Sequence, residues 1–141
     1  MIQDFVSQFL DIKIENVIKI GKKYFQTDEE FLSQLPKEAR YSGKYLGEET
    51  KRGLRPSAIL LDMLKDTENY VIIDEKSEWL FLCGRDIFGQ SIIKLNKKRG
   101  FVLVKNKNNE VLGLANVMGK QEAKIPIKNL FDKGDFLRRE K

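Results

Sequence analysis

Several short β-strand patterns follow one another closely in the second half of the chain, and this spacing constrains the fold more than any other sequence feature. The segments share β-branched and aromatic residues and are Tyr70–Asp74, Ser91–Leu95, Gly100–Lys105, Val111–Met118 and Ala123–Ile127. Asn108 and Asn109 predict a turn between the third and fourth segments, and Pro126 marks an edge or an end of the fifth. Short strands in such close succession predict a small barrel or sandwich.

One short helix is expected among these strands, over Ser77–Cys83, with Gly84 ending it. Apolar neighbours surround Trp79 and Phe81, so both rings are expected in the core rather than as platforms for stacked bases. Cys83 lies in the same apolar run, which predicts a buried structural thiol.

The first half of the chain mixes helix and strand patterns. Ile2–Leu10 has apolar residues at helical spacing, and Asn16–Gln26 predicts a hairpin that turns at Gly21. Thr27 and Glu30 have the spacing of a capping box, which predicts a short helix that ends near Pro36.

A second helix is predicted to close this half. Tyr41–Leu54 predicts a strand followed by a turn or loop, and Pro56 occupies an expected first helical position. The face of that helix is predicted to consist of Ile59, Leu60, Met63 and Leu64. The polar stretch 66–69 is then the predicted boundary, which gives an α+β domain over residues 1–67 and a β-rich domain over 68–141.

The composition excludes most catalytic chemistry. Histidine is absent and Cys83 is the single cysteine, which excludes intramolecular disulfides, cysteine metal clusters and histidine-dependent nucleophiles. The carboxylates and lysines that remain show no telling spacing, so no catalytic residue, metal or cofactor is expected. No apolar run approaches the roughly 18 residues of a membrane helix, and the first ten residues do not resemble a signal peptide, so a cytoplasmic protein without membrane contact is expected.

Basic residues are concentrated in the last third of the chain. Residues 94–141 hold 13 Lys or Arg against 5 Asp or Glu, whereas residues 1–93 hold 13 against 16. This asymmetry suggests a polyanionic partner, because Lys and Arg side chains on loops can reach phosphates. The candidate contacts are Lys97, Lys98 and Arg99 in a predicted loop, Lys124 and Lys128 around the last predicted strand, and Lys133, Arg138 and Arg139 in the tail.

Three segments of the second half resemble a PUA domain, the module named after pseudouridine synthases and archaeosine transglycosylases. They are Leu80–Ile92 (LFLCGRDIFGQSI), Gly100–Gly113 (GFVLVKNKNNEVLG) and Ile127–Glu140 (IKNLFDKGDFLRRE). The closing pattern is similar to that of small, Nip-seven-like ribosome-biogenesis proteins, and a related pattern ends Fmu-type RNA methyltransferases. Gly43–Leu64 (GKYLGEETKRGLRPSAILLDML) resembles the pre-PUA region of the same proteins.

The resemblance implies a pseudo-β-barrel PUA domain behind an α+β pre-PUA domain, which binds structured, ribosomal RNA without catalysis. It carries over Lys124, Lys128, Lys133, Arg138 and Arg139 as RNA contacts, and adds Arg85, which borders the RNA-facing groove. Ribosome-assembly proteins are the partners that it implies.

Two alternatives stay open at this point. The chain is either an accessory tail subunit of an RNA methyltransferase, or a protein-docking module whose basic face meets an acidic partner. Methyl-donor binding by the isolated chain is not expected, because it lacks a glycine-rich cofactor loop.

Overall fold

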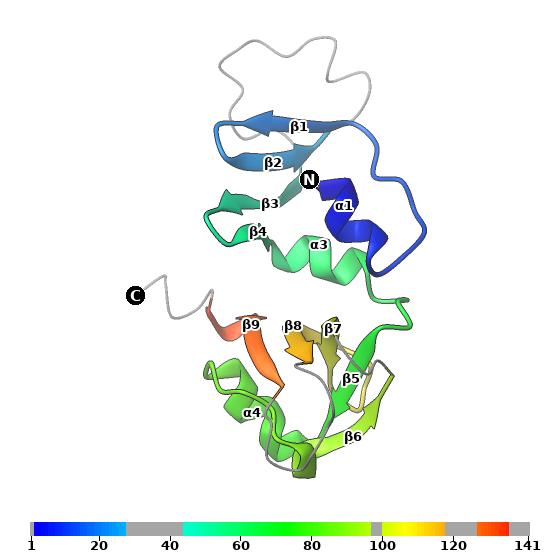
Figure 1. The fold of residues 1–141 in the computed structure, drawn as a ribbon, viewed down its shortest axis with the longest axis vertical. Helices are drawn as coiled ribbons and strands as arrows, with labels where there is room; N and C mark the ends of the chain where they lie inside the picture. Colours follow the sequence, from blue (N-terminus) through cyan, green and yellow to red (C-terminus); the bar gives the residue numbers. More distant parts are fainter. Residues whose placement is uncertain (1, 28–43, 97–99, 118–126, 136–141) are drawn as a thin grey trace. The chain divides into compact units, whose positions relative to one another are not determined.

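The computed structural model describes residues 2–27, 44–96, 100–117 and 127–135, and it divides into two compact units (Figure 1). The first unit is Met1–Met63 and the second is Leu64–Lys141. Within the described ranges, no helix is long and apolar enough to cross a membrane.

The first unit holds a four-stranded antiparallel sheet in the order β1-β2-β3-β4, with a helix before it and one after it. Its elements are α1 (Ile2–Ser7), β1 (Val17–Ile20), β2 (Lys23–Gln26), β3 (Lys44–Thr50), β4 (Gly53–Pro56) and α3 (Ala58–Met63). The first helix is present but ends at Ser7 rather than at the predicted Leu10, and the hairpin at Gly21, whose φ is 63°, is as predicted. The helix predicted between Thr27 and Pro36 lies outside the described residues.

Helix α3 begins later than the sequence predicted. Pro56 pairs with Gly47 as the last residue of β4, and the Ser57 hydroxyl caps the helix by accepting from the Leu60 N–H at 3.0 Å. The helix buries Leu60 and Leu61, and Leu64 directly after it is also buried, whereas Ile59 is 45% exposed. The helix packs against β3 with Leu61 buried in place of the predicted Ile59, so the predicted face is rotated around the helix axis.

The second unit is a five-stranded sheet in the order β6-β5-β7-β8-β9, with β5 and β7 parallel and the other pairs antiparallel. Its elements are β5 (Tyr70–Ile73), α4 (Glu75–Leu82), the 3-10 turn η1 (Gly89–Ser91), β6 (Ile92–Leu95), β7 (Gly100–Lys105), β8 (Val111–Val117) and β9 (Lys128–Asp132). Four of the predicted strands are present, with ends shifted by a residue or less. Of the fifth, only Ile127 is described; it forms an isolated bridge with Ile87. Strand β9, which follows it, was not predicted.

The core of the second unit lies along β5, β7 and β8 under α4. Val71, Val102, Val104 and Ala115 are fully buried, and Phe81 of α4 is 1% exposed. Each large apolar side chain buried here contributes about 1.5–3 kcal/mol relative to exposure. Three consecutive β7 residues are fully buried, which indicates that both faces of this central strand are covered.

Helix α4 turns Phe81 inward and Trp79 outward. Trp79 is 68% exposed and Cys83 is exposed, so the predicted core positions of both residues are wrong, whereas that of Phe81 is confirmed. Successive helical residues lie about 100° apart around the axis, so positions 79 and 81 point to nearly opposite sides. A single buried stripe cannot hold both rings.

The ends of α4 are capped by the residue types the helix needs. The Asp74 carboxylate accepts from the Ser77 N–H at 2.8 Å, and this hydrogen bond lowers the pKa of Asp74. Gly84, with φ of 94°, follows the last turn as predicted.

The Asp74→Asn variant is expected to keep the cap and lose its pH dependence, because Asn caps helices about as well as Asp. A depressed carboxyl pKa in the folded state stabilises the protein above the unfolded pKa of about 3.9, and this stabilisation disappears as the pH falls through the folded pKa. The melting temperature of the wild type should therefore fall relative to that of Asp74→Asn between about pH 4 and pH 2. A constant difference over that range, in melts followed by circular dichroism, would contradict the cap.

Candidate nucleic-acid interface

The loop that follows α4 is fastened to strand β9 through Asn129. The Asn129 N–H donates to Asp86 Oδ1 at 2.9 Å, and its side-chain amide donates to the carbonyls of Phe81 (3.0 Å) and Arg85 (3.3 Å). Beyond this point, Ile87 and Ile127 exchange two backbone hydrogen bonds of 2.9 and 2.7 Å. The loop is thus held against β9 on both sides of Asp86.

The chain after β9 returns to the end of α4. Residues 132–135, Asp-Lys-Gly-Asp, make this close approach possible. Asp132 is 3% exposed, and its carboxylate accepts from the Asp135 N–H at 2.8 Å and from the Asn129 amide at 3.2 Å. Gly134 passes so close to α4 that an added Cβ would lie 1.8 Å from the Leu82 carbonyl oxygen. Only glycine fits there, so this part of the closing motif docks the chain on α4 (Figure 1).

Two predicted contact residues are brought together by this framework. Arg85 lies in the fastened loop, and Lys128 directly precedes Asn129 on β9, an edge strand of the sheet. Both side chains are exposed, and within the described ranges neither has an ion pair. Lys133 follows the other end of β9, about 16 Å further along the strand. It is half-buried, and its N–H donates to the Leu112 carbonyl.

The other predicted contacts lie outside the described residues. They are Lys97, Lys98, Arg99, Lys124, Arg138 and Arg139.

Exposed apolar side chains accompany Arg85 and Lys128, and the sequence did not point to them. Phe88, in the same loop as Arg85, is 50% exposed, and Leu130, two residues after Lys128 on β9, is 43% exposed. Trp79 is exposed on α4, the helix that leads into this loop. The placement of Phe88 beside Gly89 in a loop was the available signal, but exposure depends on tertiary packing. Cations beside exposed rings can bind phosphates and stack on unpaired bases.

A second polar feature of this unit surrounds Lys105, which is 4% exposed. Its ammonium group donates to the Lys65 carbonyl at 2.5 Å and lies 4.7 Å from the Tyr70 ring centroid, and burial lowers its pKa. It borders a pocket of about 390 Å³ that carries both signs of charge, with Lys65, Asp66 and Glu68 in its lining. Among the described residues, no group of three metal-binding side chains is found.

Comparison with known proteins identifies the second unit. A family model described as the UPF0113 PUA domain matches residues 69–141. A UPF0113 protein of Archaeoglobus fulgidus is 31% identical over 110 residues, which are 72% of this chain and 63% of that protein. The chain therefore spans less than two thirds of this relative's length.

Solved structures agree on the fold. A conserved PUA domain protein from Thermoplasma acidophilum aligns with a TM-score of 0.67 at 19% identity, covering 99% of this chain and 91% of that one. A PUA domain from Aeropyrum pernix K1, solved as a tartrate complex, aligns with a TM-score of 0.61 at 7% identity, over 96% of this chain and 82% of that one. The predicted α+β class with a PUA domain is confirmed, while the pre-PUA and Nip-seven-like assignments stay predictions. The match over residues 69–141, together with the related archaeal protein, places the chain in the UPF0113 family of PUA-domain proteins.

Proposed function

We propose that the chain is a non-catalytic RNA-binding protein that meets structured RNA with the surface formed by Arg85, Phe88, Lys128 and Leu130. PUA domains typically bind RNA. The observation that carries the proposal is the Asn129 junction, which holds a cationic and apolar loop beside a cationic edge strand. We call these four residues the loop–edge surface.

The composition of the loop–edge surface favours RNA over a chemical substrate. Arginine and lysine give affinity for phosphates, and an exposed phenylalanine offers a face for a splayed base. RNA helices present shape and phosphates more readily than base edges, which suits a surface with few hydrogen-bonding amides. Ribosomal RNA as the target, and ribosome-assembly proteins as partners, follow from the resemblance of the closing motif and belong to the same proposal.

Binding of a structured ribosomal RNA fragment is expected to weaken at least tenfold in the Arg85→Glu, Lys128→Glu variant. Each charge reversal replaces attraction for a phosphate with repulsion. Trp79 is the single tryptophan of the chain and is exposed on α4, so its fluorescence provides a label-free signal near the loop–edge surface. The affinity is measured by titration at several salt concentrations.

Lys13→Glu, Lys107→Glu is the matched control, since it makes the same change in net charge at exposed lysines on other parts of the chain. It should lose only the small, nonspecific part of the affinity. Two results would overturn the proposal: no RNA binding by the wild type at about 50 mM salt, where phosphate contacts are strong, or equal losses in the two variants. If the wild type binds an acidic protein but no RNA, the protein-docking alternative is favoured.

A further inference from the structure

The two hairpins of the first unit turn at the same end of its sheet (Figure 1). The β1–β2 hairpin turns at Gly21 and Lys22, and the β3–β4 hairpin turns at Lys51 and Arg52. Strands β2 and β3 are paired between them, and the Glu49 N–H donates to the Lys22 carbonyl at 2.7 Å. Since neighbouring strands lie about 4.8 Å apart, the centres of the two turns are about 10 Å apart across the strands, and the β3–β4 turn extends about two residues further along them.

Both turns are tightly formed. Gly21 and Gly53 have φ values of 63° and 111°, which glycine adopts without strain. In the β3–β4 turn, the Thr50 hydroxyl donates to the Gly53 carbonyl at 2.7 Å and accepts from the Arg52 N–H at 3.2 Å. The backbone that carries the cations is thereby held in place, so binding a rigid ligand costs little ordering of these turns.

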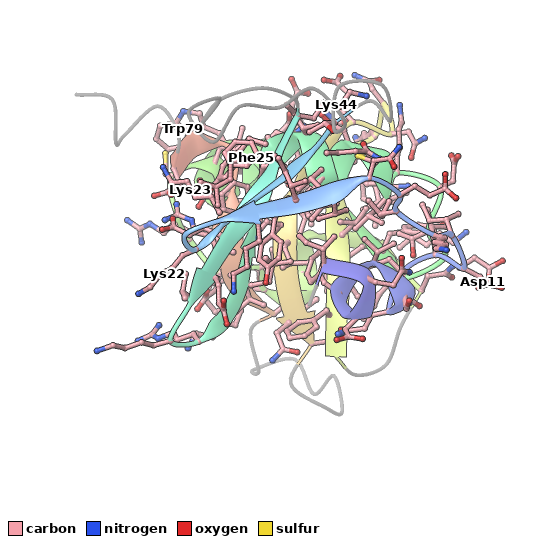
Figure 2. The ribbon with its side chains drawn as sticks, turned by 90° about the horizontal axis from the view of Figure 1, so that it is seen from above. Asp11, Lys22, Lys23, Phe25, Lys44 and Trp79 are labelled. Carbon is pink, nitrogen blue, oxygen red and sulfur yellow. The ribbon has the colours of Figure 1, made fainter. Side chains whose placement is uncertain are left out.

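Four exposed cations gather on these turns: Lys22, Lys23, Lys51 and Arg52, here called the turn cluster. Within the described ranges none of the four has an ion pair. Figure 2 shows Lys22 and Lys23 at the opposite end of the first unit from Asp11.

The acidic residues of this end compensate the charge of the turn cluster only in part. Segments 19–23 and 48–55 hold 6 basic and 2 acidic residues. Glu49 already forms an ion pair with Lys19. The Lys19 ammonium lies 2.5 Å from the Glu49 carboxylate and lowers the pKa of Glu49. Glu48 is half-buried in the row between Lys23 and Arg55. A concentrated positive potential at this end therefore remains, although the net charge of residues 1–63 is close to zero.

We propose that the turn cluster binds the phosphate backbone of RNA as a second contact surface, separate from the loop–edge surface. Tyr24, the aromatic residue next to Lys23, is 9% exposed, so this end presents charge rather than a stacking ring. Such a surface adds affinity and positioning without reading sequence. The proposal goes beyond the function proposed above and relies on it only for the choice of RNA as ligand.

The test replaces the turn cluster in the full chain by Lys22→Gln, Lys23→Gln, Lys51→Gln and Arg52→Gln. If the cluster neutralises three to four phosphates, the slope of log affinity against log salt should become shallower by roughly 2–4, at about 0.7 per contact on single strands and 0.9 on duplexes. Affinity at low salt should fall at least tenfold. The loss should be similar for RNAs of unrelated sequence.

The matched control is Lys13→Gln, Lys65→Gln, Lys94→Gln and Lys107→Gln, which removes the same charge from four other exposed positions. An equal slope in the two quadruple variants overturns the turn cluster and leaves the loop–edge surface standing. A loss confined to the turn variant, with Arg85→Glu, Lys128→Glu still binding, supports the cluster and removes the loop–edge surface. Binding of poly-glutamate to the wild type and to the turn-cluster variant is measured in parallel. If the variant loses poly-glutamate binding by the same factor as RNA binding, the cluster is a general anion-binding surface, which overturns an RNA site.

Discussion

The Gly113→Ala variant is expected to destabilise the second unit by about 3 kcal/mol, at the upper end of the cost of overpacking a core. Gly113 lies in β8 opposite Asp132 of β9, and an added Cβ would come within 2.1 Å of the Phe131 carbonyl oxygen. The same Cβ would lie 2.9 Å from the ring of Phe81. Backbone on one side and a fully buried ring on the other leave it no direction in which to relax.

Urea denaturation followed by far-ultraviolet circular dichroism measures this loss. For a unit of this size, a loss of about 3 kcal/mol corresponds to a melting temperature lower by roughly 12–24 °C. Gly89→Ala is the matched control, because nothing lies within 4 Å of a Cβ at Gly89. It should change the stability by no more than about 0.5 kcal/mol. A similar, small effect for Gly113→Ala would mean that β8 and β9 are not paired in this register.

The Gly134→Ala variant is expected to cost a comparable amount, about 2–3 kcal/mol. An alanine methyl group there would lie 1.8 Å from the Leu82 carbonyl oxygen and 3.0 Å from Asp132 Oδ1. To relieve the clash, the chain after β9 must move off α4, and the hydrogen bond from the Asp135 N–H to the buried Asp132 is then lost. A buried carboxylate that loses one of its hydrogen bonds is itself costly.

The same denaturation measurement applies to Gly134→Ala, with an additional readout in hydrogen exchange. The amide of Asp135 should exchange faster than in the wild type and in Gly89→Ala, because its acceptor is displaced. A stability loss below about 0.5 kcal/mol, the range of neutral surface changes, together with unchanged protection of that amide, would contradict the docking of this segment on α4.

Local patterns in the sequence were enough to predict most of the elements. The hairpin at Gly21, the strands from Tyr70 to Val117, and the helix ended by Gly84 follow from alternation, turn residues and caps that act within a few positions. Strand β9 was missed because its pattern is interrupted: Asn129 takes the place of an inward apolar residue to bind Phe81 and Arg85. No local rule predicts a polar residue whose partners lie about 45 positions away.

The candidate surfaces show the same limit. The excess of basic residues near the C-terminus was visible in the sequence and led directly to Lys128, whereas Arg85 was added only by the resemblance. The turn cluster was hidden, because the acidic residues of the first 93 positions outweigh its charge when the segment is summed. Lys22 and Lys51 become neighbours only through the pairing of β2 with β3.

By itself the sequence determined the kinds of elements, the mixed α+β class and the absence of histidine chemistry, since these depend on residue type and on spacing over a few positions. The tertiary structure alone decided that Trp79 faces outward, that the loop of Arg85 is held against the strand of Lys128, and that four cations share one end of a sheet. Exposure and proximity depend on which distant segments pair and in which register. That choice is made by the packing of the whole unit rather than by any one stretch of the chain.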